Sequence, residues 1–151
     1  MSLNDIEKKV KIRFLILISI IAVLVNTCTP DNTSPNSNDT RDKIVDTWNC
    51  SETVGPFGAQ SFQVDISKDP NNSTRVFLDN FFDLKVGSGV YATMSGLQLN
   101  IPSQKIVISQ NDQWTFSGTG SISNNYKSIT LNYTADDGNG PKQVIDNLSL
   151  P

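Results

Sequence analysis

The sequence contains no histidine. This absence excludes Ser-His-Asp and Cys-His nucleophilic catalysis, imidazole metal sites and histidine acid-base chemistry. Two cysteines in 151 residues cannot form a disulfide framework. Charged residues make up only 18% of the chain and its net charge is −3, so no basic surplus favours nucleic-acid binding. We therefore expect a protein that is not an enzyme and that needs neither a metal nor an organic cofactor.

The sequence also lacks an apolar run long enough to cross a bilayer comfortably. The longest such run near the N-terminus, residues 14–25, follows a basic segment at 8–13. As a helix this run is about 18 Å long, against a hydrocarbon core of roughly 30 Å. A basic segment followed by a short apolar run is typical of a secretory signal peptide. We assign residues 1–27 to a signal peptide, with a retained short membrane anchor as the alternative.

Residues 25–28, Val-Asn-Thr-Cys, resemble a bacterial lipobox, in which an aliphatic residue precedes the lipidated cysteine by three positions. The resemblance implies that Cys28 is the lipidation site, which would hold the protein on a membrane without a spanning element. The alternative is ordinary cleavage near Thr27, which leaves Cys28 as a plain thiol. Thr29, and not aspartate, follows the cysteine. By the sorting rule of enteric bacteria, this implies anchoring at the outer membrane of the cell envelope.

A polar segment separates the leader from the rest of the chain. Residues 29–41 include no aliphatic or aromatic side chain, so we expect 28–41 to form a lipid anchor and a disordered linker. The structured domain is then expected at 42–151. Removal of residues 1–27 takes away four basic and two acidic residues, which leaves a net charge of −5. Adsorption to nucleic acid or to anionic lipid is therefore unfavourable.

Apolar and polar residues alternate with a period of two in several runs within 42–151, at 62–67, 97–101, 114–122 and 129–134, and no stretch has the periodicity of an amphipathic helix over three turns. Turns rich in Gly, Asn, Asp and Pro punctuate this alternation. The nine strands that we predict cover residues 44–54, 60–68, 74–83, 89–95, 97–101, 104–109, 113–123, 128–135 and 143–149.

Short connections make sequential strands neighbours, so the expected topology is a meander. Eight or nine such strands with one apolar face close most economically into an antiparallel β-barrel, which leaves no exposed edge. A two-sheet β-sandwich is the alternative. Gly118 and Gly120 fall on the inward face of a long strand. Their missing side chains would permit sharp coiling or make room for a neighbouring indole.

Residues 44–50, Ile-Val-Asp-Thr-Trp-Asn-Cys, open the first strand much as a Gly-x-Trp segment opens lipocalin-like (calycin-like) barrels, with Asp46 at the glycine position. Together with segments 66–70, 116–122 and 129–134, this pattern resembles small Bacteroidota lipoproteins with such a domain. The resemblance implies an all-β, lipocalin-like barrel on a lipid anchor, in a group whose function is mostly unassigned.

Matching alternation phases predict which side chains point into the barrel. Aliphatic members of this set are Val64, Ile66, Ile129 and Leu131. The aromatic members, which are our candidate ligand-binding residues, are Trp48, Phe62, Trp114, Phe116 and Tyr133. Because the strands are short, we expect these side chains to fill most of the interior. A shallow pocket should remain at one mouth, near the loops at 55–58 and 87–89.

Three functions remain open. The first is a lipoprotein whose barrel binds a small apolar or amphipathic ligand, since an eight-stranded barrel can hold one. The second is a surface lipoprotein that acts through protein contacts and has a fully packed barrel. A hydrolase is the third, and its candidate carboxylates are Glu52, Asp65, Asp79 and Asp83. We expect these four on the solvated surface. Cys50 is expected to be a small buried hydrophobic residue.

Overall fold

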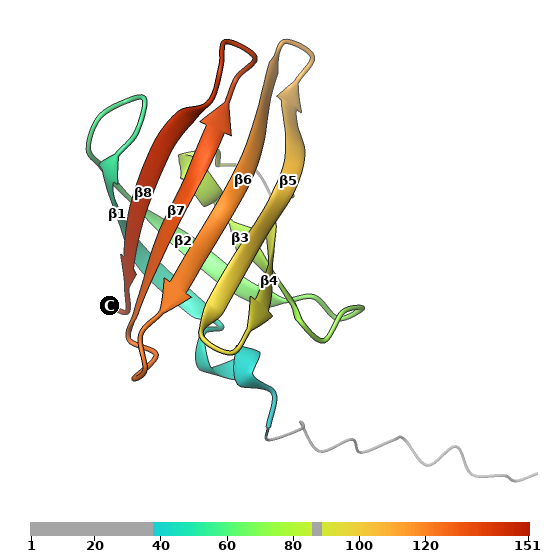
Figure 1. Cartoon of the computed structure of the whole chain (residues 1–151), viewed down its shortest axis with the longest axis vertical. Coiled ribbons are helices and arrows are strands. Elements are labelled where there is room, and N and C mark those ends of the chain that lie inside the picture. Colours follow the sequence, from blue (N-terminus) through green and yellow to red (C-terminus); the bar gives the residue numbers. More distant parts are fainter. Residues whose placement is uncertain (1–37, 86–88) are drawn as a thin grey trace, which may run out of the picture. The chain divides into compact units, whose positions relative to one another are not determined.

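The computed structural model describes residues 38–85 and 89–151 (Figure 1). The signal peptide and Cys28 lie outside the described residues. The eight described strands form one closed antiparallel barrel, in which each strand pairs with its neighbours in sequence and β1 pairs with β8. The predicted all-β, lipocalin-like meander barrel is thus confirmed, and the sandwich alternative is wrong. The strands are β1 (Asp46–Val54), β2 (Gln60–Lys68), β3 (Arg75–Asp79), β4 (Tyr91–Ser95), β5 (Gln98–Ser109), β6 (Asp112–Ile122), β7 (Ser128–Asp136) and β8 (Lys142–Ser149).

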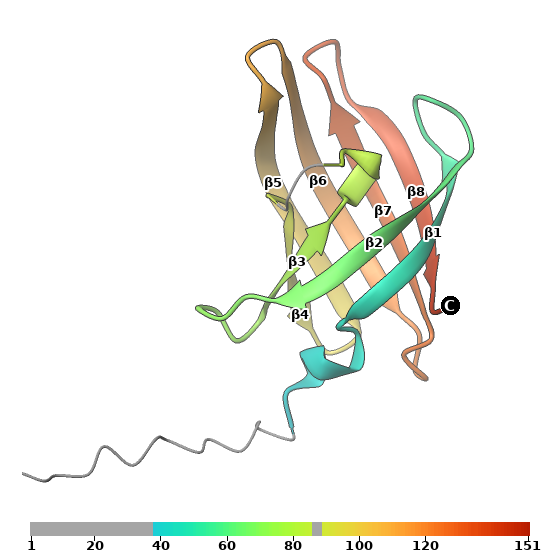
Figure 2. The same ribbon diagram turned by 180° about the vertical axis from the view of Figure 1, so that it is seen from behind.

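The two ends of the barrel carry different connections (Figures 1 and 2). At the end drawn uppermost, called the upper end below, lie the β1–β2, β5–β6 and β7–β8 loops. A short 3-10 helix, η2 (Phe81–Asp83), connects β3 towards β4 at the same end. The lower end carries the β4–β5 and β6–β7 turns and a second 3-10 helix, η1 (Thr40–Lys43).

Two predicted strand boundaries are wrong. The segments predicted as separate strands at 97–101 and 104–109 form one strand, β5, with a register shift between Ile101 and Gln104. Pro102 lies inside this shift, where a missing backbone N–H is tolerated because the ladder is interrupted. The strand predicted at 74–83 ends at Asp79, and the chain then turns into η2.

Alternation predicted the inward face correctly for most of the core. Trp48, Phe116 and Tyr133 are at most 1% exposed, and the predicted aliphatic residues are also buried. Two of the nine predicted inward side chains, Phe62 and Trp114, are only partly buried and pack against the core from its edge. They lie nearest the ends of the inward-facing rows, where the barrel no longer covers them on all sides.

The inward glycines make room for neighbours on the adjacent strand. A Cβ at Gly118 would lie 2.4 Å from the Tyr133 Cβ and 2.5 Å from its Cα. Tyr133 is the direct cross-strand partner of Gly118, so the large ring can sit close to the β6 backbone. Gly120 likewise faces Leu131 and Leu99. The spaces left by the glycines are therefore filled by these side chains and not by an indole.

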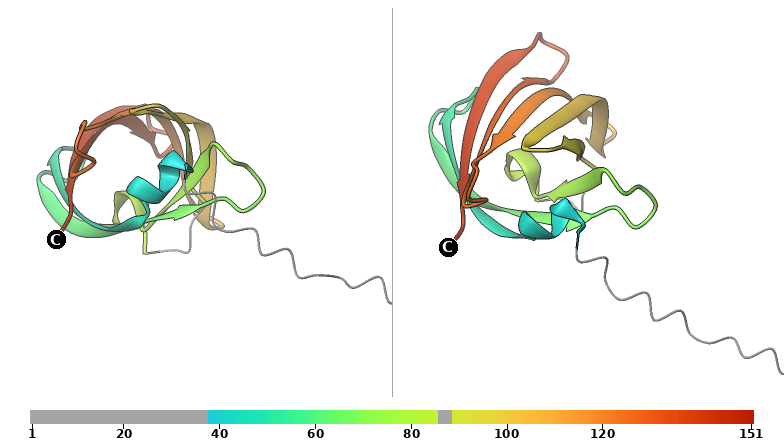
Figure 3. Two further views of the ribbon diagram at one scale, coloured as in Figure 1. Left: turned by 90° about the horizontal axis from the view of Figure 1, so that it is seen from below. Right: turned by 60° about the horizontal axis from the view of Figure 1, so that its bottom comes forward.

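The lower end is closed by η1, which lies across the opening when the barrel is seen from below (Figure 3). Arg41 of η1 is 7% exposed. Its Nη1 donates hydrogen bonds to the carbonyl oxygens of Asp69 (3.2 Å), Asn72 (2.7 Å) and Arg75 (2.9 Å). Each of these carbonyls also accepts a backbone N–H within this segment, so one guanidinium adds a second hydrogen bond to three acceptors around the β2–β3 connection. Asp39 pairs with the same side chain at 2.7 Å, and this hydrogen bond lowers the pKa of Asp39 to about 2.

The ordered fold therefore begins before the expected boundary at residue 42. Asp39 accepts a hydrogen bond from the Arg41 backbone N–H, which caps η1, and Lys43 lies 4.5 Å above the Tyr126 ring of the β6–β7 turn. Directly after η1, the carbonyl of Ile44 accepts the indole N–H of Trp48 at 2.9 Å. The last residues assigned to the linker are thus part of the lower closure. The order of these residues could not be predicted from the sequence, because a buried arginine that hydrogen-bonds to carbonyl groups adds no apolar residue to the pattern.

Within the described residues, no helix is both long and apolar enough to pass through a membrane.

Candidate functional site

An open groove lies at the upper end of the barrel. Its volume is about 360 Å³. The β1–β2 loop, the η2 segment and the facing ends of β5 and β6 enclose it. Its described lining residues are Phe57, Gln60, Phe82, Asp83, Leu84, Ile108, Asp112 and Trp114. This upper groove adjoins the 55–58 loop, as expected from the sequence, while residues 86–88 of the second expected loop lie outside the described part of the chain.

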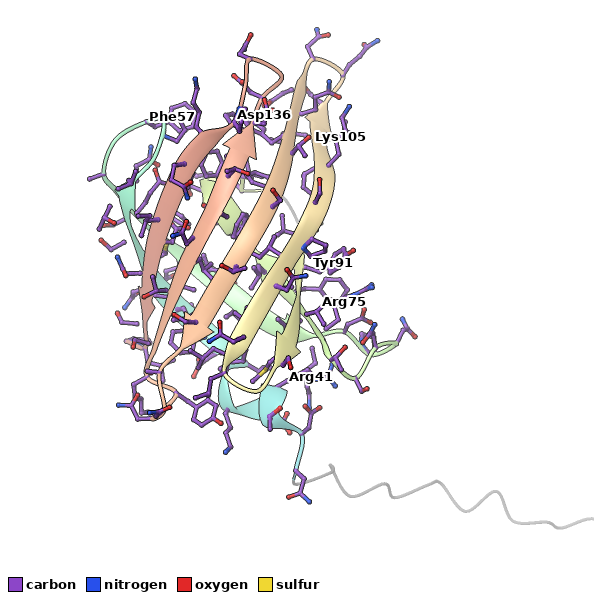
Figure 4. All side chains as sticks on the ribbon, in the orientation of Figure 1. Arg41, Phe57, Arg75, Tyr91, Lys105 and Asp136 are labelled. Carbon is purple, nitrogen blue, oxygen red and sulfur yellow. The ribbon has the colours of Figure 1, made fainter. Side chains whose placement is uncertain are left out.

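Three aromatic rings meet at the upper groove. The Phe82 and Trp114 ring centroids are 5.0 Å apart, and Phe57 lies 5.8 Å from Phe82 and 6.0 Å from Trp114. Phe57 is 64% exposed. Figure 4 shows it on the β1–β2 loop at the upper end. A phenyl ring held against two others and open to water offers apolar and π surface to a ligand.

A strained segment brings Phe82 into the upper groove. Asn80, Phe82, Asp83 and Lys85 all have φ between 52° and 58°, which is the left-handed region. For a bulky side chain such as Phe82 this conformation is unfavourable and persists only when its surroundings enforce it. Asn80 supplies part of that support. Its Nδ2 donates to the Gln63 carbonyl at 2.7 Å, and its Oδ1 accepts the Lys85 backbone N–H at 2.9 Å.

Two carboxylates line the upper groove. The Asp112 Oδ1 accepts the indole N–H of Trp114 at 3.0 Å, which fixes the orientation of the indole. The Asp83 Oδ2 lies 3.8 Å from the Lys85 Nζ, and Lys85 is 79% exposed. The described lining includes no basic side chain. The upper groove therefore combines aromatic surface with negative charge.

The lumen below the upper groove is filled by packed rings. Phe82 lies 5.4 Å from Phe116, and Phe81 lies 5.2 Å from Phe116 and 4.6 Å from Tyr133. Figure 3 shows η2, which carries Phe81 and Phe82, within the ring of strands. The cavity beside Phe81 measures only about 10 Å³, which is space for about one water molecule. These packed rings lie beneath the upper groove, which opens at one mouth of the barrel.

A pair of carboxyl groups lies inside the barrel. Glu52 and Asp146 are direct cross-strand partners on β1 and β8, and they are 2% and 0% exposed. The Tyr133 hydroxyl donates to the Asp146 Oδ2 at 2.9 Å. The Glu52 Oε1 and the Asp146 Oδ1 have no hydrogen-bond partner among the described residues. Burial of such groups favours their protonated, neutral forms.

The pKa values of the interior groups follow from this burial. Burial, together with the neighbouring Asp146, raises the pKa of Glu52 to about 7. Burial raises the pKa of Asp146 to about 6, although the Tyr133 hydrogen bond opposes the shift. Burial likewise raises the pKa values of Tyr133 and Cys50. Cys50 is 3% exposed, so it is a buried thiol and not a reactive one.

The expectation that all four candidate hydrolase carboxylates are solvated is wrong for Glu52. Asp65 is exposed, and Asp79 and Asp83 are half-buried. Gly55 makes the burial of Glu52 possible, because a Cβ at this position would overlap the Glu52 Oε1. Within residues 38–85 and 89–151, no three His, Cys, Asp or Glu side chains converge to hold a metal ion.

The structure separates the five predicted ligand-binding aromatics. Only Trp114 lines the upper groove, and Phe116 and Tyr133 pack beneath it. Trp48 is fully buried, and its indole N–H bonds to Ile44 of the lower closure. Phe62 instead touches a second depression, the polar groove, of about 390 Å³. Its other described lining residues are Asn49, Cys50, Ser51, Ser61, Gln63, Asn147 and Ser149.

Sequence reasoning missed most of the upper groove. Phe57 and Phe82 lie in a loop and in a 3-10 turn, where alternation says nothing about side-chain direction. One signal was available for Phe57, since an aromatic residue between glycines in a loop has no core to enter and is a candidate contact residue. The inward direction of Glu52 and Asp146 could have been predicted from alternation, because Glu52 shares the inward phase of Trp48 and Asp146 shares that of Leu148.

Comparisons with known proteins place the chain in no family. No protein-family model matches it, and no curated protein is significantly similar to it. The functional argument therefore rests on the residues and geometry described above.

Proposed function

We propose that the protein is a lipoprotein of the bacterial cell envelope whose barrel binds a small apolar or amphipathic ligand at the upper groove. The observation that carries the binding proposal is the strained η2 segment, which holds Phe82 against Trp114 and the exposed Phe57. Phe82 is also a core residue, but the left-handed backbone around it and the 64% exposed ring of Phe57 both cost stability. Features of this kind concentrate at binding sites.

The anchoring part of the proposal rests on the leader. Residues 1–27 have the composition of a signal peptide, and Cys28 follows at the lipobox position. We expect lipidation of Cys28 to hold the protein at the outer membrane. Replacement of Cys28 by Ala should move the protein from the membrane fraction to the soluble fraction, with Cys50→Ala as the matched control. Membrane retention of Cys28→Ala with an intact leader would instead indicate a retained helix.

The binding part is tested with a neutral apolar fluorescent probe, N-phenyl-1-naphthylamine. Wild-type protein should enhance its emission in a saturable manner, and Trp114→Ala should weaken this binding at least threefold because a main wall of the upper groove is lost. Phe62→Ala is the matched control, since it removes a partly buried aromatic that is absent from the described lining of the upper groove. No saturable binding to the wild type, or equal losses in both variants, would contradict the proposal.

Protein contact remains the second candidate function. It is favoured by the filled lumen and by the polar groove, whose Asn, Ser and Gln side chains can hydrogen-bond to a partner. We do not propose an enzymatic role. The chain has no histidine, and the interior pair Glu52 and Asp146 is absent from the described lining of the upper groove.

A further inference from the structure

We propose that the upper groove selects an organic cation, namely an ammonium group attached to an apolar body. This inference rests on the proposed binding function of the upper groove and adds the charge of its ligand. The argument starts from the lining, in which two carboxylates and three aromatic rings surround the same space.

The rings favour positive charge. The face of an aromatic ring carries partial negative charge, and an ammonium group is attracted to it within about 6 Å of the centroid. Phe57, Phe82 and Trp114 lie within 6.0 Å of one another, so a cation that enters the groove meets more than one ring. Phe57 is 64% exposed and Trp114 is only partly buried, so these two rings offer surface to a ligand, while Phe82 is buried behind them.

The carboxylates add a full negative charge at the same place. Asp112 is hydrogen-bonded to the Trp114 indole, so its charge is fixed beside the largest ring of the groove. Asp83 directly follows Phe82, and both residues line the groove. An anionic amphiphile, such as a fatty acid, would bring its carboxylate against these two groups. Like-charge repulsion therefore disfavours it, and the groove is complementary to a cation.

The ion pair between Lys85 and Asp83 is weak enough for a ligand's ammonium group to replace it. Its Nζ lies 3.8 Å from the Asp83 Oδ2, but the lysine side chain is 79% exposed. Ion pairs of this exposed kind contribute little to stability and rearrange easily. A ligand's ammonium group would therefore compete with Lys85 for Asp83. Removal of the lysine charge should strengthen the binding of a cationic ligand.

The test compares three dansyl probes with the same ring system and different charges. These are dansylcadaverine, which carries an ammonium group, uncharged N-butyl dansylamide, and dansyl-6-aminohexanoate, which carries a carboxylate. We expect the cationic probe to bind the wild type at least fivefold more tightly than the neutral one, and the anionic probe to bind most weakly. The preference should shrink as the salt concentration rises from 20 mM to 500 mM, because exposed charges are screened.

Substitutions of the charged residues at the groove test whether the preference for the cationic probe arises there. Asp83→Asn and Asp112→Asn should each weaken binding of the cationic probe roughly threefold more than they weaken binding of the neutral probe. Lys85→Gln should strengthen binding of the cationic probe by a similar factor. Asp65→Asn removes an exposed carboxylate on β2 outside the described groove lining and serves as the matched control.

The outcomes separate this inference from the proposed function. Equal binding of all three probes, lost in Trp114→Ala, would overturn the charge inference and support the groove as an apolar site. Tighter binding of the anionic probe would also overturn the inference. Saturable binding of none of the probes would contradict the ligand-binding function itself. A cation preference that persists in both aspartate variants would overturn the assignment to Asp83 and Asp112.

Discussion

The two ends of the barrel are finished by different means. At the lower end, η1 lies across the opening, and Arg41 donates to three carbonyl acceptors around the β2–β3 connection. At the upper end, four residues in and beside η2 have left-handed φ values, and Phe57 of the β1–β2 loop is 64% exposed (Figure 4). The lower end thus gains buried hydrogen bonds, whereas the upper end carries strain and exposed apolar surface. This difference between the two ends is what the proposed binding function at the upper groove would account for.

The two tryptophans give the largest expected contrast. Trp48 is fully buried and hydrogen-bonded to Ile44, so Trp48→Ala should lower the free energy of unfolding by about 3–5 kcal/mol. Trp114 is half-buried at the upper groove, so Trp114→Ala should cost only about 1–2 kcal/mol. Urea unfolding followed by circular dichroism measures both. Equal costs would remove the distinction between the two ends.

Arg41 tests the lower closure next. Arg41→Met keeps most of the apolar stem but leaves the carbonyls of Asp69, Asn72 and Arg75 without this donor. We expect a loss of about 2–3 kcal/mol in the free energy of unfolding. Lys85→Gln at the upper end is the control and should change stability by less than about 0.5 kcal/mol, since its ion pair is exposed. A loss below 1 kcal/mol for Arg41→Met would contradict the closure.

The interior carboxyl pair predicts an unusual pH dependence. The pKa values of Glu52 and Asp146 rise from 4.5 and 3.8 to about 7 and about 6 on folding. The folded state therefore binds more protons than the unfolded state between about pH 4 and pH 7. The contribution of the pair to stability is greatest below this window and is lost as the pH rises through it, by several kcal/mol.

Substitution of the pair should remove this dependence. Asp146→Asn keeps an oxygen to accept the Tyr133 hydroxyl, and combined with Glu52→Gln it should make stability nearly flat from pH 4 to pH 8. The measurement is the urea midpoint at each pH, with Asp65→Asn as the control. The same fall with pH in the double variant would mean that other groups cause it. The lowered pKa of Asp39 acts in the opposite sense and below pH 4, so the two effects are separable.

Phe57 gives the smallest expected effect on stability. Because its ring is 64% exposed, Phe57→Ala should change the free energy of unfolding by less than about 0.5 kcal/mol. Binding of N-phenyl-1-naphthylamine should nevertheless weaken, since the ring forms one side of the upper groove. This combination sharpens the division between stability and binding. A large loss of stability would show that the loop belongs to the core.

Period-two alternation predicted the barrel strands, because burying one face of a strand requires an apolar residue at every second position. The same alternation placed Trp48, Phe116 and Tyr133 correctly in the interior. It did not predict η2, because Phe81 and Phe82 are both buried although they are consecutive. A left-handed turn at Asn80 and Phe82 places both rings inside, and an Asn-Phe-Phe-Asp sequence gives no local reason to expect one.

Sequence-based prediction also failed for the buried ionisable groups. Glu52 has the inward phase of Trp48 and Cys50, yet the rarity of buried carboxylates argued for a surface position. Its burial depends on the missing side chain of Gly55 and on Asp146 across the strand pair, and neither relation is local in sequence. The candidate site could be placed at one mouth of the barrel, but its aromatic and acidic lining required the three-dimensional structure.

The central claim, that the upper end binds and the lower end stabilises, has a direct reporter at each end. The chain has two tryptophans, and their indole N–H groups bond to Asp112 at the upper end and to Ile44 at the lower end. In a ¹H–¹⁵N spectrum of residues 38–151, each gives one indole signal. Titration with dansylcadaverine should shift the Trp114 signal and leave the Trp48 signal in place. A shift of the Trp48 signal alone, or of neither signal at saturating probe, would contradict the account.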